Sequence, residues 1–114
     1  MSDCLFCKIV AKTIPANVVH EDNQVMAFRD ISPKAPTHIL VIPKKHIATV
    51  NDIGDDDKLL IGHMISVAKQ LANSEGLAED GYRLVMNCND DGGQTVFHIH
   101  LHLLGGRQMS WPPG

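Results

Sequence analysis

Three histidines alternate with apolar residues in the segment TVFHIHLHLLGG, residues 95–106. They are His98, His100 and His102. Successive side chains of a β-strand point to opposite faces, so we expect the three imidazoles on one face and Phe97 with the later apolar residues in the core. Imidazole titrates near neutral pH, can act as a nucleophile, and ligates zinc in its neutral form. The spacing therefore predicts a catalytic site or a metal site rather than a solvated strand.

The loop before these histidines, DDGGQT at 90–95, contains Gly92 and Gly93. Glycine adopts unusual backbone dihedral angles, so consecutive N–H groups can converge on an anion. Gln94 and Thr95 add neutral hydrogen-bond donors. We expect the loop and the histidines to form a pocket for one phosphate group. Because the chain has neither a Walker-type lysine loop nor a dinucleotide-type glycine pattern, a nucleotide would be held in a different way.

The elements around this site follow from hydrophobic periodicity and turn residues. The expected elements are a short helix at 4–12 capped by Ser2 and Asp3, strands at 18–21 and 25–28 forming a hairpin, a proline-containing loop at 31–37, a buried strand at 38–43, a long helix at 55–76, a strand at 82–87 and the histidine strand. Short connections favour antiparallel pairing. The class is therefore α+β, and we expect the helices to lie on one face of the sheet.

Composition limits the function classes. With 114 residues, we expect a single domain spanning residues 1–114. The formal net charge of -3 argues against nucleic acid or an anionic membrane as a partner. No apolar stretch is long enough to cross a bilayer. An odd count of three cysteines without a secretory signal predicts a reducing, cytoplasmic location.

The sequence resembles the histidine-triad (HIT) family, in its Hint branch. The motif of that family, His-x-His-x-His-x-x with apolar residues at x, is complete at 98–104. The segments FRDISPKAPTHILVIPKKHI, GYRLVMN and WPPG also resemble that branch. The resemblance implies a five-stranded antiparallel sheet with one long and one short helix, continued across a homodimer.

It further implies a purine nucleoside phosphoramidase that cleaves the P–N bond of nucleoside 5′-monophosphate amides. AMP-lysine-like amides and aminoacyl-adenylates are the candidate substrates, and AMP or GMP the nucleotide. His100 would attack phosphorus and become nucleotidylated, His102 would hold the phosphoryl oxygens or the leaving group, and His98 would orient the row. The chemistry needs no cofactor. The implied nucleotide contacts are Asn87, Gly93, Gln94 and Thr95 for the phosphate and 5′ region, Asp30 for the ribose, and Phe6, Ile9, Phe28 and Ile31 for the base.

Two of these residue assignments have competing interpretations. Cys4 and Cys7 have the spacing of metal ligands, and the resemblance adds His46 and His98 as partners in a structural zinc site. The alternative is a pair of buried thiols. Asp30 could accept hydrogen bonds from a ribose diol or cap the loop that follows its strand.

Other functions remain open at this stage. The alternatives are a dinucleoside polyphosphate hydrolase, a nucleotide-binding module with incidental turnover, and a metal-dependent hydrolase that uses all three histidines as ligands. The remaining histidines, His20, His38 and His63, are expected to be surface or structural residues. Trp111 lies in a proline-bounded tail, and the resemblance places it near the pocket of the other protomer.

Overall fold

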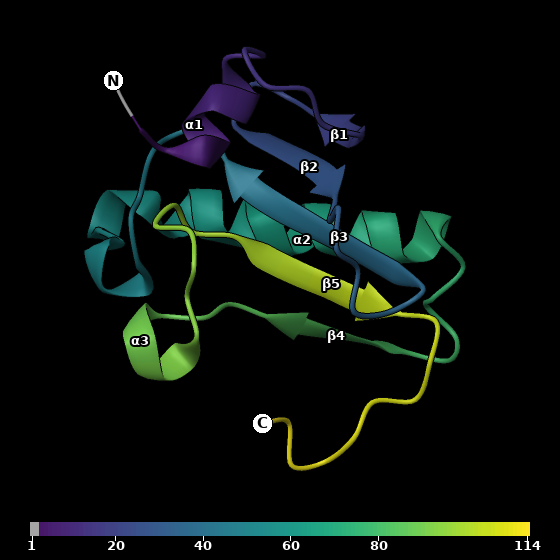
Figure 1. The fold of residues 1–114 in the computed structure, drawn as a ribbon. Helices are drawn as coiled ribbons and strands as arrows, with labels where there is room; N and C mark the ends of the chain where they lie inside the picture. Colours follow the sequence, from purple (N-terminus) through teal and green to yellow (C-terminus); the bar gives the residue numbers. More distant parts are fainter. Residues whose placement is uncertain (1–2) are drawn as a thin grey trace.

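The computed structural model describes residues 3–114, and five antiparallel strands form its sheet. Their spatial order is β1-β2-β3-β5-β4, and every neighbouring pair is antiparallel (Figure 1). The strands are β1 Val18–Glu21, β2 Val25–Arg29, β3 Thr37–Pro43, β4 Tyr82–Val85 and β5 Leu101–Gly105. The helices are α1 Leu5–Val10, α2 Lys58–Ser74 and α3 Asn89–Gly92. The predicted five-stranded sheet with one long and one short helix is confirmed, and α3 adds one further turn.

Helix α2 packs on one face of the sheet because its apolar residues recur at helical spacing. Leu60, Met64 and Leu71 are buried in the same cluster as the inward-facing residues of β3 and β5. The helix ends at Ser74, Gly76 follows with a φ of 77° in the left-handed region, and the N–H of Leu77 donates to the carbonyl of Ala72. The acidic residues expected in its first turn form a separate 3₁₀ turn, Asp55–Asp57.

Helix α1 covers the opposite face of the sheet, so the expectation of both helices on one face was wrong. Phe6 and Ile9 of α1 pack with Met26, Phe28 and Leu40 in a second cluster. The reason is that β2 and β3 carry buried residues on both faces of the sheet, so a helix or loop must pack against each face. Figure 1 shows α1 and α2 on either side of the sheet.

The short helix is capped by Cys4, not by the residues expected. The Sγ of Cys4 accepts a hydrogen bond from the N–H of Cys7 at 3.3 Å. Of the two expected caps, Ser2 lies outside the described residues and Asp3 precedes the observed cap. The helix ends at Val10. The predicted end, Lys12, lies outside it because its backbone is in the left-handed region, with a φ of 65°. Cys4 therefore starts the element that also carries Cys7.

The histidine segment forms a strand only from Leu101 onward, later than predicted. Ile99, Leu101 and Leu103 are buried as expected, but Phe97 is 45% exposed, so its predicted core position was wrong. Strand pairing with β3 begins at Leu101, and before that residue no ladder enforces alternation. Among the described residues, no helix is long and apolar enough to cross a membrane.

Candidate active site

A cavity of about 280 Å³ lies beside the histidine segment, on the face of the sheet that α1 covers. His100 and His102 form part of its wall. The rest of the wall comes from α1 and the segment after it, from the end of β2 and the loop that follows, from β3, and from the loop before His98. These residues are Leu5, Phe6, Ile9, Ile14, Pro15, Ala16, Phe28, Arg29, Asp30, Ile31, Leu40, Thr95 and Val96.

The ring of His100 is held by one hydrogen bond that fixes its tautomer. Its Nδ1–H donates to the backbone carbonyl of His98 at 2.9 Å. The neutral ring therefore carries its lone pair on Nε2. The ring of Phe6 packs edge-on against it, with centroids 5.0 Å apart. His100 thus presents an oriented, unprotonated nitrogen in a cavity wall, as a nucleophile requires.

His102 is held by His38, and this pair also has a defined proton arrangement. The N–H of Lys34 donates to Nδ1 of His38 at 3.1 Å, so the proton of a neutral His38 lies on Nε2. That Nε2–H donates to Nδ1 of His102 at 2.9 Å. The proton of His102 must then lie on its own Nε2.

The Nε2 of His102 is buried and has no hydrogen-bond partner within residues 3–114. A buried donor without a partner is unfavourable in a folded protein and is common where a ligand supplies the acceptor. The rings of His100 and His102 have centroids 4.9 Å apart. The cavity therefore holds a nucleophilic nitrogen and a proton donor side by side.

Burial keeps these rings neutral at physiological pH. Desolvation lowers the pKa of His100, and the carbonyl of His98 opposes this shift only in part. Desolvation, with smaller contributions from His100 and His38, lowers the pKa of His102 to about 4. Desolvation also lowers the pKa of His38. The tautomers derived above are therefore the forms present at pH 7.

The three triad histidines do not share one ion. Nδ1 of His98 lies 3.4 Å and 3.5 Å from the sulfurs of Cys4 and Cys7, whereas Nδ1 of His102 faces His38. The Nδ1 of His100 is bonded to a carbonyl. The geometry therefore does not favour the alternative of a hydrolase whose metal is bound by all three histidines.

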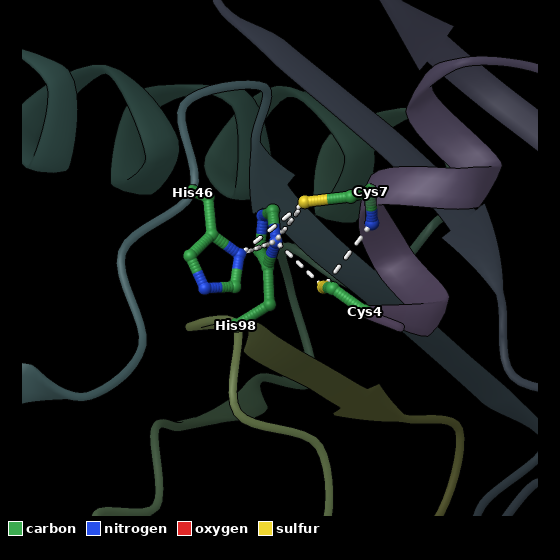
Figure 2. A group of neighbouring side chains, drawn as sticks. All are labelled: Cys4, Cys7, His46 and His98. Carbon is green, nitrogen blue, oxygen red and sulfur yellow. Dashed lines mark hydrogen bonds between the residues drawn. The ribbon is translucent and has the colours of Figure 1, made fainter. Parts of the chain in front are cut away.

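A separate cluster, Cys4, Cys7, His46 and His98, has the donors of a Cys₂His₂ metal site (Figure 2). Its four ligand atoms lie within 4.8 Å of one another. Nδ1 of His46 is 3.3 Å from Sγ of Cys7 and 3.2 Å from Nδ1 of His98. A tetrahedral zinc ion separates such N and S ligand atoms by about 3.3–3.8 Å. The resemblance-based ligand set therefore fits zinc.

His98 connects the cluster to His100. Its Nε2–H donates to the carbonyl of Pro43 at 2.8 Å, which leaves the lone pair of Nδ1 directed into the cluster. Metal-binding histidines commonly donate their second ring N–H to such an outer acceptor. The backbone carbonyl of the same residue accepts the Nδ1–H of His100. One fully buried residue thus takes part in both sites.

Comparison with known proteins identifies the family that has this sequence and fold. A family model described as HIT domain matches residues 11–109. The chain belongs to the HIT domain family. It is 55% identical over 107 residues to the purine nucleoside phosphoramidase of Escherichia coli (strain K12), covering 94% of this chain and 90% of that protein. The resemblance drawn from the triad motif is therefore confirmed.

Solved HIT structures agree with the fold. The HIT family hydrolase from Legionella pneumophila is 65% identical, with a TM-score of 0.97, over 98% of this chain and 100% of that one. The histidine triad nucleotide-binding protein from Candida albicans is 33% identical, with a TM-score of 0.83, over 96% of this chain and 83% of that one. Both share the open antiparallel sheet that positions the histidines.

The glycine loop differs from its prediction. Residues 89–92 form the single turn of α3, and Gly93 ends it with a φ of 80°. The N–H of Gly93 donates to the carbonyl of Asp90, and that of Gln94 to the carbonyl of Asn89. These N–H groups therefore close a helix end and do not form the predicted anion-binding nest.

The side chain of Gln94 is also fully used within the protein. Its amide donates to the carbonyls of Ala48 and Val96 and accepts from the N–H of Asn89. Its predicted role as a phosphate donor is thus contradicted in this conformation, because both N–H bonds of the amide are taken. Thr95 remains on the cavity wall as a phosphate-binding candidate.

The other predicted nucleotide contacts divide into two groups. Those that line the cavity are Phe6, Ile9, Phe28, Asp30, Ile31 and Thr95. Those that lie outside its wall are Asn87, Gly93 and Gln94. Asn87 lies close to Gly92: a Cβ added at Gly92 would lie 3.6 Å from the backbone carbonyl carbon of Asn87. The carboxylate of Asp30 caps the loop by accepting a hydrogen bond from the N–H of Ser32. Asp30 also borders the cavity, where a ribose could reach it.

Sequence reasoning missed the contact of His38 with the third histidine of the triad. His38 is 6% exposed and contacts His102, whereas the sequence placed it among surface or structural histidines. The available signal was its position on the strand next to the histidine strand, on the same face as Leu40. The register of β3 and β5 places Leu40 opposite His102.

The low pKa of His102 predicts acid destabilisation. A histidine with a pKa of about 6.5 unfolded and about 4 folded stabilises the protein above pH 6.5, and this stabilisation is lost as the pH falls towards 4. We expect His102 to account for about 2–3 kcal/mol of the loss between pH 7 and 4.5. Urea unfolding at both pH values, at one protein concentration, measures this loss. The His102→Gln variant should lose less stability over the same interval, and an equal loss would contradict the assignment.

Proposed function

We propose that this protein is a purine nucleoside phosphoramidase that hydrolyses the P–N bond of nucleoside 5′-monophosphate amides. One observation carries the proposal: the rings of His100, with an unprotonated Nε2, and of His102, whose buried Nε2–H has no partner among residues 3–114, lie side by side in the wall of one cavity. The name of the E. coli relative supports it. AMP-lysine-like amides and aminoacyl-adenylates are the proposed substrates.

In the first step, Nε2 of His100 attacks phosphorus and a P–N bond to the histidine forms as the P–N bond to the amine breaks. The departing amine needs a proton, which solvent water supplies, because a neutral His102 that gave up its Nε2–H would be left as an imidazolate; that N–H instead donates a hydrogen bond in the cavity. The same N–H can stabilise charge on a phosphoryl oxygen. In the second step water attacks phosphorus, the bond to Nε2 of His100 breaks, one proton of that water passes to solvent, and the nucleotide and neutral His100 are released.

The nucleoside would lie against the apolar part of the cavity. The side chains of Phe6, Ile9 and Phe28 offer flat, buried surface for a base, and Ile31 is fully exposed at the rim. A base that covers Ile31 would remove that apolar surface from water. The carboxylate of Asp30, already bonded to one N–H, retains lone pairs for the ribose hydroxyls.

A substrate panel tests this proposal. The protein would be incubated with adenosine and guanosine phosphoramidates of several amines, and with dinucleoside polyphosphates. We expect turnover of the phosphoramidates to exceed that of the polyphosphates. Preference for polyphosphates would favour the dinucleoside polyphosphate hydrolase, and binding of AMP without turnover of any substrate would favour a nucleotide-binding module.

We also propose a structural zinc ion held by Cys4, Cys7, His46 and His98. The support is the donor set, the spacing of its atoms and the second hydrogen bond of His98. Zinc here would tie α1 to the histidine segment; the four protein ligands leave no open position for substrate. Thiolate ligands persist in a reducing compartment, in keeping with the proposed cytoplasmic location.

A homodimer is proposed from the edge of the sheet. Strand β4 pairs only with β5 and forms one edge, and the guanidinium of Arg83 on that strand donates to the carbonyl of Ser110 in the tail. The next residue, Trp111, is 82% exposed. An edge strand of this kind can continue its ladder into a second copy, and the tail would then lie near the partner's cavity.

Removal of residues 109–114 tests the tail. Light scattering should find a dimer for both the full-length and the truncated protein. The ratio of kcat/KM between bulky and small amines should change by about threefold or more, because Trp111 would no longer contact the leaving group. Trp111→Ala is the matched point variant. A monomer at micromolar concentration would contradict the dimer, and unchanged ratios would contradict the role of the tail.

A further inference from the structure

The first turn of α1 carries parts of two different sites. Cys4 and Cys7 belong to the Cys/His cluster, while Leu5, Phe6 and Ile9 line the cavity proposed for the nucleoside. These residues alternate within six positions, so the two thiols and this part of the cavity wall belong to one short segment.

The sulfurs tie this helix to the rest of the protein. Sγ of Cys4 lies 3.4 Å from Nδ1 of His98, and Sγ of Cys7 lies 3.3 Å from Nδ1 of His46. The two sulfurs therefore contact both the loop after β3, through His46, and the histidine segment, through His98 (Figure 2). The other described contacts of α1 include the apolar packing of Phe6 and Ile9 and the edge-on contacts of the Phe6 ring with the rings of His98 and His100. The cluster thus holds one wall of the cavity.

The same two sulfurs are placed for oxidation. Their atoms lie within 4.8 Å of each other, they are three residues apart across one helical turn, and neither cysteine is fully buried. Cα atoms at that spacing in a helix are about 5–6 Å apart, within the range that a disulfide spans. His46, the exposed member of the cluster, opens it to solvent, so a small oxidant can reach the sulfurs.

We propose that the Cys4–Cys7 pair is a site of reversible oxidation that controls nucleotide affinity, with a hydroperoxide as the oxidant. Two thiols and one hydrogen peroxide give one S–S bond and two waters: the sulfurs lose two electrons, the O–O bond breaks, and the two thiol protons leave with the oxygens. The sulfurs then cease to be ligands, so α1 is no longer tied to His46 and His98. The inference rests on the proposed function, because the affinity concerned is that for its nucleotide.

The expected kinetic signature is specific. His98 keeps its hydrogen bond to Pro43, and His100 keeps its bond to the carbonyl of His98, since neither involves sulfur. The nucleophile therefore stays oriented, and kcat should change by less than about threefold. The nucleoside wall loosens, so the KM for a phosphoramidate and the Kd for AMP should rise about tenfold or more.

The experiment uses the zinc-loaded full chain carrying Cys88→Ser, which removes the third thiol. Hydrogen peroxide should produce a mass loss of two hydrogens on the peptide containing Cys4 and Cys7, release zinc to a colorimetric chelator, and weaken AMP binding by calorimetry. A thiol reductant with added zinc should restore AMP affinity. The Cys7→His variant keeps a metal-ligand side chain but has no pair to oxidise, so its Kd should not respond to peroxide.

Three results would overturn the inference: a Cys4–Cys7 disulfide with unchanged AMP affinity, no such disulfide under peroxide, or global unfolding of the oxidised protein by circular dichroism. Failure of the reduced, zinc-loaded protein to bind AMP would instead contradict the proposed function. If Cys7→His does not fold, the recovery of AMP affinity on reduction of the protein that carries both Cys4 and Cys7 still tests the inference.

Discussion

Replacement of His100 with alanine should lower kcat/KM for an adenosine phosphoramidate about 10⁴-fold, which is ~5.5 kcal/mol of transition-state stabilisation. The reason is that Nε2 of His100 forms the bond to phosphorus, and no other ring in the cavity has the same orientation. The Nδ1 of His102 is occupied by His38, and its Nε2 carries a proton. Steady-state kinetics with the purified variant measures the loss.

A matched control separates this effect from general loss of a histidine. His20 lies on β1, is partly exposed, and bonds to Asp22 outside the cavity wall. The His20→Ala variant should retain turnover within about twofold. In the wild type, acid quenching during turnover should trap a nucleotidyl group on the peptide that contains His100. Substantial activity in His100→Ala would indicate general-base chemistry through His102 and contradict nucleophilic catalysis.

The alternation of the triad predicted the chemistry better than it predicted the backbone. His100 and His102 line one cavity and His98 lies in the Cys/His cluster, yet only His102 lies within β5. Side chains alternate strictly only where a neighbouring strand fixes the backbone, and the ladder with β3 starts at Leu101. Phe97 lies outside the ladder, which explains why its core position could not be predicted from period alone.

Long-range pairing accounts for the missed histidine. His38 and His102 are 64 residues apart in the chain, and their contact depends on the register between β3 and β5. The sequence identified both strands but not their register. Without the register, the sequence does not show that the strand of His38 lies beside the strand of His102. The hydrogen bond from the N–H of Lys34 to His38, which sets the tautomer, is likewise a loop contact that no sequence pattern predicts.

The glycine loop shows how one composition supports two local structures. A Gly-Gly pair can form an anion-binding nest or end a helix, and both need positive φ. Here the preceding residues complete one helical turn, so Gly93 accepts the left-handed conformation at its end. The choice depends on the hydrogen bonds of Gln94, whose side chain fastens the loop to Ala48. That contact spans 46 residues and has no local signal.

Removal of the zinc ligands should have the largest effect on stability. If free zinc exceeds its Kd about 1,000-fold, binding to the folded state contributes about 4 kcal/mol, and a protein of this size should lose roughly 15–20 °C in Tm without it. Metal analysis of protein purified without chelator should find about one zinc per chain. Calorimetry of Cys4→Ser and of chelated wild type should give the same lowered Tm, because both lack the ion.

The third cysteine provides the control, since Cys88 caps α3 outside the cluster and Cys88→Ser should keep both zinc and Tm. Turnover measured well below the lowered Tm distinguishes the roles of the metal. The orientation of His100 depends on the carbonyl of His98, and the ring of His98 retains its bond to Pro43, so chelated protein should keep a wild-type kcat within about threefold. A metal that activates water would instead be required for every turnover. Immediate loss of kcat in folded, chelated protein would therefore contradict a purely structural ion, whereas absence of zinc with both thiols freely titratable would contradict the site itself.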